Sequence, residues 1–122
     1  MKLIGTGSAL PKKVVTNAML SEFLDTSDEW IVPRTGIHTR HVISDEELKD
    51  LGAQAALKAL EMAGLKPEDI DYFICSNVIN EYITPGLSCI IAEEIGLACP
   101  CVDINCACPG FIYAMDIAEC HF

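Results

Sequence analysis

The chain has 122 residues, of which 51% are hydrophobic, and its 18 acidic and 8 basic residues give a formal net charge of −10. This acidic balance argues against nucleic acid or an anionic membrane surface as a partner. No stretch approaches the ~18 consecutive apolar residues that a membrane span requires. We therefore expect a cytoplasmic protein whose core buries roughly two-thirds of its unfolded surface. The hydrophobic fraction is high for a free-standing domain of this size, so we also expect apolar surface that a longer chain or a second subunit would cover.

The spacing of apolar residues, caps and breakers predicts the following elements in chain order: a strand at residues 2–6, helices at 17–24, 26–36 and 45–63, a strand at 72–76, a helix at 85–95, a strand at 101–104 and a helix at 109–120. Strands alternate with helices in the second half of the chain. This order predicts βαβ units and a layered α/β fold.

Two capping boxes mark helix starts in the first half of the chain. Thr26 is followed three residues later by Glu29, and Ser44 is followed at the same spacing by Glu47. In such a box the first side chain caps a backbone N–H of the new helix, and the acidic side chain reaches back to the cap residue. We therefore expect Thr26 and Ser44 to cap their helices.

Cys108 is the candidate nucleophile. It follows the strand predicted at 101–104 and stands directly before Pro109, which is a favoured first residue of a helix. The unpaired N–H groups and partial positive charge at a helix start stabilise a thiolate. Gly110 is expected to leave room for a substrate beside the backbone. The alternative is that Cys108 is a small buried apolar side chain.

The chain contains seven cysteines without the regular spacing of a disulfide framework, so we expect reduced thiols. Cys75, Cys89 and Cys120 are interpreted as buried apolar side chains. Four cysteines within ten residues raise the alternative of a metal or redox protein: Cys99, Cys101, Cys106 and Cys108. Zinc sites generally pair cysteines two to four residues apart on turns, whereas these flank a predicted strand, and we expect no metal.

The partner groups that a catalytic cysteine needs are not obvious in the sequence. His121 lies near the far end of the helix that follows Cys108, about 20 Å away by helical rise. His38 and His41 are expected in a loop. Trp30 and Arg34, four residues apart, share one helical face and either pack there or hold a planar base and a phosphate.

Four stretches carry a resemblance to a known family: Gly5 to Pro11, Asp25 to Ile31, Arg34 to Ile37 and Cys108 to Phe111. In order and spacing they resemble the N-terminal portion of β-ketoacyl-[acyl-carrier-protein] synthase III, a member of the thiolase-like superfamily. The resemblance covers essentially the whole chain. It implies that residues 1–122 are an N-terminal fragment of a thiolase-like condensing-enzyme domain.

The resemblance also implies an activity, the initiation of fatty-acid synthesis. Cys108 would take an acyl group, commonly acetyl, from coenzyme A, and malonyl-acyl carrier protein would then condense with it on decarboxylation. Thr26, Trp30 and Arg34 would help to hold the adenine end of coenzyme A. Coenzyme A thioester is thus a substrate, and no bound cofactor is expected.

Other features of the family lie outside this chain. Family members are two to three times as long, their catalytic His and Asn lie in the second half, and so does the docking patch for acyl carrier protein. The fragment alone is therefore expected to be inactive in the full condensation reaction, and the full-length parent to be a homodimer. Thr84 falls in a loop that in the family reaches a partner's acyl pocket. The alternatives are a non-catalytic coenzyme A-binding or dimerisation fragment and a polyketide starter synthase.

Overall fold

The computed structural model describes residues 2–121. The chain forms two compact units. The smaller unit comprises residues 10–48, and the larger unit comprises residues 2–9 and 49–121. Within residues 2–121 no helix has both the length and the apolar character needed to cross a membrane.

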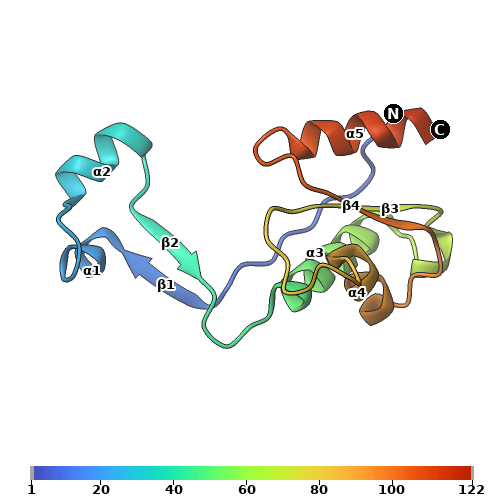
Figure 1. Cartoon of the computed structure of the whole chain (residues 1–122), viewed down its shortest axis with the longest axis horizontal. Helices are drawn as coiled ribbons and strands as arrows, with labels where there is room; N and C mark the ends of the chain where they lie inside the picture. The colour runs from blue at the N-terminus through green and yellow to red at the C-terminus, as the bar shows by residue number, and fades with distance from the viewer. Residues whose placement is uncertain (1, 122) are drawn as a thin grey trace. The chain divides into compact units, whose positions relative to one another are not determined.

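The larger unit is built on two parallel strands, β3 (Phe73–Ser76) and β4 (Cys101–Ile104), which pair residue for residue from Phe73 with Cys101 to Ser76 with Ile104. Helix α4 (Leu87–Ile95) connects them, and helix α5 (Gly110–His121) follows β4. Helix α5 covers one face of the strand pair, and α3 (Leu48–Ala63) and α4 lie on the other face (Figure 1). A βαβ unit with helices on both faces is the layered α/β arrangement that the sequence predicts.

The core of the larger unit forms where α3 and α4 meet β3. Ala53 of α3 packs with Leu87, Ile91 and Ile95 of α4, and Phe73 of β3 lies against this cluster. The small residues of α3 allow close approach, because a Cβ atom at Gly52 would collide with the Ile91 side chain. Each fully buried aliphatic side chain of this kind contributes roughly 1.5–3 kcal/mol.

The expectation of a strand at residues 2–6 is wrong, because this segment lies along α3 and pairs with no strand. Gly7 makes the approach possible: a Cβ atom there would lie 2.6 Å from the Ala59 backbone nitrogen and would also collide with the Ala55 carbonyl. The Lys58 ammonium donates to the Ser8 carbonyl at 2.7 Å and anchors the segment to the helix.

The smaller unit contains an antiparallel strand pair that the sequence did not predict, β1 (Lys13–Thr16) and β2 (Thr39–Val42). Helix α1 (Asn17–Ser21) follows β1 directly, and helix α2 (Asp28–Thr35) precedes β2. The strands were missed because each has four residues and neither alternates apolar with polar side chains over its length.

Most expected helices begin or end within a few residues of the observed ones. The longest helix starts at Leu48 and not at Asp45, because the carboxylate of Glu46 bonds to Ser44 N at 3.2 Å and to Lys12 N at 2.8 Å. These backbone hydrogen bonds, first that from Lys12 and then that from Ser44, lower the pKa of Glu46 to about 2. Ser44 therefore belongs to a turn. Before β3 the chain forms a short 3-10 helix, η1 (Pro67–Asp69).

Candidate active site

Cys108 lies in the turn between the end of β4 and the start of α5, and it is exposed. The preceding residue, Ala107, has a left-handed backbone with φ of 50°, and its carbonyl accepts a hydrogen bond of 3.0 Å from Gly110 N. This turn reverses the chain from strand to helix within a few residues. Ligands of open α/β sheets bind outside the carboxyl ends of the strands, which is where Cys108 lies.

Gly110 has a different role from the one expected. It is buried at the first residue of α5, and a Cβ atom there would collide with the Ser76 Oγ at the end of β3. The glycine therefore allows the start of α5 to pack against β3. It does not provide free space for a substrate.

A polar cluster that the sequence interpretation missed joins the strand ends to α4. The carboxylate of Asp103 accepts hydrogen bonds from Ser88 Oγ at 2.7 Å, from Ser88 N at 3.2 Å and from Asn77 Nδ2 at 2.7 Å. Ser88 is 0% exposed. The sequence feature that could have revealed this cluster is a carboxylate inside an otherwise apolar four-residue strand. Burying a carboxylate is costly unless it is paired, so such a residue indicates buried partners.

All seven cysteines carry free thiols, but they differ in their surroundings. Burial raises the pKa of the Cys75 thiol, a hydrogen bond from Asn77 opposes this shift, and the charge of Asp103 adds to it. Burial also raises the pKa of Cys101. The expectation of burial is wrong for Cys89 and Cys120, which are exposed. Among residues 2–121 no group of three His, Cys, Asp or Glu side chains is arranged to hold a metal ion.

The residues assigned to coenzyme A lie in the smaller unit. Trp30 and Arg34 are brought together on α2, with the Arg34 guanidinium carbon 4.5 Å from the Trp30 ring centroid. Arg34 Nη1 also donates to the Trp30 carbonyl at 2.9 Å. Trp30 is 55% exposed, so the indole retains a free face. A guanidinium stacked on an open indole is suited to a planar, anionic ligand.

Thr26 is not the cap of this helix. The cap is Ser27, whose Oγ accepts a hydrogen bond of 3.2 Å from Trp30 N. Gly36, in the left-handed conformation, ends α2 as expected. Thr26 is partly buried just before the cap.

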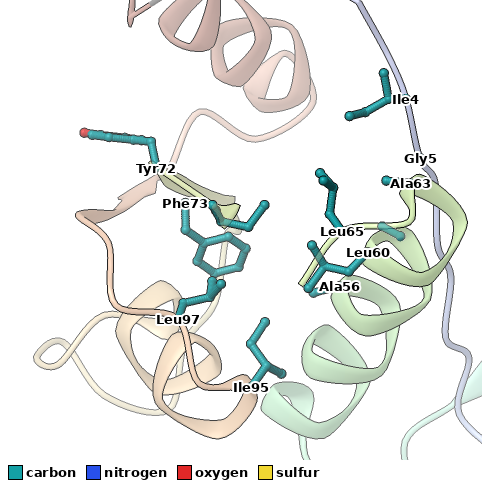
Figure 2. A pocket seen from close by; sticks show the side chains of 12 residues that line it. Ile4, Gly5, Ala56, Leu60, Ala63, Leu65, Tyr72, Phe73, Ile95 and Leu97 are labelled. Atoms are coloured by element: carbon teal, nitrogen blue, oxygen red, sulfur yellow. The ribbon is translucent and has the colours of Figure 1, made fainter. Parts of the chain in front are cut away.

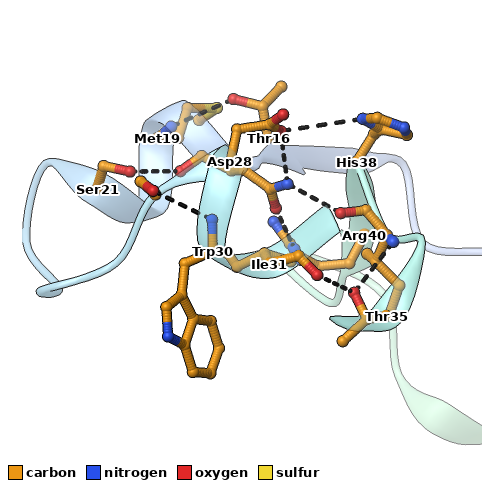
Figure 3. A network of polar contacts seen from close by, with 12 residues as sticks. Thr16, Met19, Ser21, Asp28, Trp30, Ile31, Thr35, His38 and Arg40 are labelled. Carbon is orange, nitrogen blue, oxygen red and sulfur yellow. Dashed lines mark hydrogen bonds and ion pairs between the residues drawn. The ribbon is translucent and has the colours of Figure 1, made fainter. Parts of the chain in front are cut away.

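A buried amide, that of Asn17, fixes α2 within the smaller unit; Figure 3 labels two of its partners, Asp28 and Arg40. Asn17 is 1% exposed. Its Nδ2 donates to Asp28 Oδ1 and to the Ile37 carbonyl, both at 2.8 Å, and its Oδ1 accepts from Arg40 Nη2 at 2.6 Å. Because Asp28 is the first residue of α2, this network sets the position of the helix that carries Trp30.

The histidines take structural positions. His41 lies in β2 and not in a loop, and its Nδ1 is 2.6 Å from the Pro11 carbonyl. His38 lies 3.9 Å from the Asp28 carboxylate. His121 stacks on Tyr72, with ring centroids 4.4 Å apart, near the end of α5.

An apolar cavity of about 310 Å³ lies within the larger unit (Figure 2). Its walls come from residues 4–5, α3, β3 and the end of α4, and include Leu60, Phe73 and Ile95. Cys108 does not line it. The cavity offers apolar surface without a nucleophile or a charged group, so it is not the candidate site.

Comparisons with known proteins show what the chain is similar to. No family model matches the chain. The chain is 47% identical over 120 residues to β-ketoacyl-[acyl-carrier-protein] synthase III of Clostridium acetobutylicum, covering 98% of this chain and 37% of that protein. It resembles the crystal structure of 3-oxoacyl-[acyl-carrier-protein] synthase III from Aquifex aeolicus with a TM-score of 0.93 and 42% identity, covering 96% of this chain and 38% of that one.

A third similar protein is a ketosynthase from a polyketide pathway. The priming β-ketosynthase of the R1128 polyketide biosynthetic pathway has a TM-score of 0.91 and 38% identity, over 96% of this chain and 36% of that one. The chain thus spans little more than a third of the length of the proteins it matches. The resemblance predicted from the sequence is confirmed: the chain has the thiolase-like α/β fold and corresponds to an N-terminal portion of β-ketoacyl-[acyl-carrier-protein] synthase III.

Proposed function

We propose that this chain carries the acyl-accepting part of an enzyme that starts fatty-acid synthesis. In the first half-reaction the Cys108 thiolate attacks the carbonyl carbon of acetyl-coenzyme A. The bond between that carbon and the coenzyme A sulfur breaks, and coenzyme A leaves as a thiolate that takes up a proton. The acetyl group is then held as a thioester on Cys108, ready for a second nucleophile.

One observation carries this proposal. Cys108 is exposed in a tight turn between the carboxyl end of β4 and the start of α5, in a chain 47% identical to a synthase of this class. Helix α5 starts at Gly110, two residues after Cys108. Backbone N–H groups near a helix start can stabilise the oxyanion formed during acyl transfer.

Coenzyme A recognition is proposed for α2. The adenine would stack on the exposed face of Trp30, and the Arg34 guanidinium would pair with a phosphate, with Thr26 beside them. The geometry of the Trp30 and Arg34 pair supports this assignment, since the Arg34 guanidinium carbon lies 4.5 Å from the centroid of the Trp30 ring.

The condensation itself is proposed for the full-length parent. There malonyl-acyl carrier protein would lose carbon dioxide, and its carbanion would attack the thioester on Cys108. The His and Asn that stabilise such a reaction in the family belong to a later part of the sequence. The carrier-protein docking patch and the homodimer are likewise assigned to the parent.

Mass spectrometry after incubation with acetyl-coenzyme A tests the first half-reaction. We expect one acetyl group on the peptide that contains Cys108, no acetylation in Cys108→Ala, and slower acetylation in Trp30→Ala and Arg34→Ala. Acetylation that persists in Cys108→Ala would refute the assignment of the nucleophile. Coenzyme A binding without acetylation would instead favour a non-catalytic binding fragment.

A polyketide starter synthase is the second candidate, because a priming β-ketosynthase has nearly the same fold over this region. The two candidate enzymes would differ in the acyl group that they transfer from coenzyme A to Cys108. Thr84, exposed before α4, is a small residue in a loop that, by the resemblance, reaches a partner's acyl pocket. Faster labelling of Cys108 by longer or branched acyl-coenzyme A than by acetyl-coenzyme A would favour the starter synthase.

A further inference from the structure

The carboxylate of Asp103 joins three elements of the larger unit. It lies on β4 and pairs across the sheet with Cys75 of β3. Its oxygens accept from the backbone and hydroxyl of Ser88, the second residue of α4, and from Asn77, just beyond β3. A single side chain therefore connects the ends of both strands to the start of the helix between them.

The fit around this carboxylate is tight. A Cβ atom at Gly86, the residue that precedes α4, would collide with Asp103 Oδ2. Because the N-terminus of a helix presents unpaired N–H groups and partial positive charge, a carboxylate there is bound more strongly than a neutral acceptor. The start of α4 is thus held in one position relative to β4.

The same strand ends hold the turn that presents Cys108. Asn77 N donates to the Ile104 carbonyl at 3.1 Å, and Asn105 Nδ2 donates to the Val78 carbonyl at 3.1 Å. One residue before Asn77, the Ser76 side chain faces Gly110 at the start of α5. A shift of Asn77 would therefore be transmitted to both ends of the Cys108 turn.

We propose that Asp103 is a positioning residue for acyl transfer, which holds the strand ends and the start of α4 so that the following turn presents Cys108 to the thioester. The inference rests on the proposed acetylation of Cys108. Asp103 itself takes no part in bond making: its negative charge fixes the geometry through Ser88 and Asn77. The loop that contains Thr84 ends at the same helix start, so its position depends on the same carboxylate.

The test is the concentration dependence of Cys108 acetylation in Asp103→Asn, which keeps the side-chain shape but removes the charge and one acceptor oxygen. We expect the maximal rate to fall about 10- to 100-fold, as misplacement of a reacting group does. The half-saturating concentration of acetyl-coenzyme A should stay within about twofold, since binding is assigned to α2. Asp116→Asn, an exposed position on α5, removes the same charge and should match the unmodified chain.

Ser88→Ala provides a second variant if Asp103→Asn fails to fold, as judged by circular dichroism. It removes one hydrogen bond and keeps the carboxylate, and a fall of about 3- to 10-fold in the maximal rate is expected for one bond to a charged group. The proposal is overturned if Asp103→Asn folds and its maximal rate is unchanged. If Asp103→Asn does not fold, the proposal is overturned when Ser88→Ala reacts like the unmodified chain. A rise in the half-saturating concentration alone also overturns it.

Iodoacetamide alkylation separates this inference from the proposed function. If the unmodified chain takes no acetyl group, the acyl-transfer proposal fails, and the alkylation rate of Cys108 relative to the exposed Cys120 then tests Asp103 alone. A changed ratio in folded Asp103→Asn or Ser88→Ala supports the positioning role. An unchanged ratio refutes it.

Discussion

Replacing Asn17 by alanine tests what holds in place the residues that we propose bind coenzyme A. The side chain is 1% exposed and makes three hydrogen bonds, two of them to the charged groups of Asp28 and Arg40. If each bond made its full contribution to the free energy of unfolding, one neutral bond and two bonds to charged groups would together contribute about 4–7 kcal/mol. The Asp28 side chain is 55% exposed and regains water in the variant. We therefore expect Asn17→Ala to lower the free energy of unfolding of the smaller unit by about 2–4 kcal/mol.

Urea unfolding followed by tryptophan fluorescence measures this change, because Trp30 is the only tryptophan and lies on α2 in the smaller unit. Ser21→Ala is the matched control: it removes one bond of 3.0 Å from Ser21 Oγ to the Asn17 carbonyl and should cost about 1 kcal/mol. If Asn17→Ala loses no more stability than Ser21→Ala, the buried amide does not hold α2, and the reasoning is wrong.

Three further predictions concern other parts of the chain. The pKa of Glu46 is lowered from 4.5 to about 2, so its bond to Lys12 N stabilises the folded state fully above pH 4.5. This stabilisation is lost as the pH falls through 2. Between these two pH values, the free energy of unfolding should therefore depend less on pH in Glu46→Gln than in the unmodified chain. Gly7→Ala should lower the thermal midpoint of the larger unit, at a cost of about 1–3 kcal/mol, because the added Cβ meets helix backbone that cannot rotate away; an unchanged midpoint would contradict the close packing. Iodoacetamide at pH 8 should label exposed Cys108 before the partly buried Cys75, whose pKa is raised by that burial, and peptide mass spectrometry can check the order. Equal rates would contradict the partial burial of Cys75.

The parts of the fold that the sequence predicts well are those with strong local signals. The strand Cys101–Ile104 is predicted with its observed bounds, and α4 and α5 lie within two residues of the expected ranges. Each combines an apolar run with a glycine or proline at its boundary. The pair β1 and β2 gave no such signal, since a strand of four residues is stabilised by its neighbour and not by its own pattern.

The candidate site could be predicted only in part. Cys108 and the pair Trp30 and Arg34 follow from local features, a proline after a cysteine and a spacing of four residues. Asp103 and Ser88 could not be paired in advance, because they are fifteen residues apart and meet only when α4 packs against β4. The helix cap was placed one residue too early for a related reason: Ser27 and Thr26 can both cap a helix, and the tertiary contacts of α2 decide between them.

The same arrangement of buried hydrogen bonds explains how two short strand pairs can hold the proposed site residues in place. In the smaller unit the buried amide of Asn17 bonds to Asp28 at the start of α2, and in the larger unit the carboxylate of Asp103 bonds to Ser88 at the start of α4. Apolar packing is non-directional and tolerates small sliding movements, whereas a buried polar group must keep its partners or bear the cost of desolvation. In each unit, hydrogen bonds from a strand or its end therefore fix the start of a helix. These bonds give α2, with its Trp30 and Arg34 pair, a defined position, and they fix the strand ends from which the turn that contains Cys108 begins.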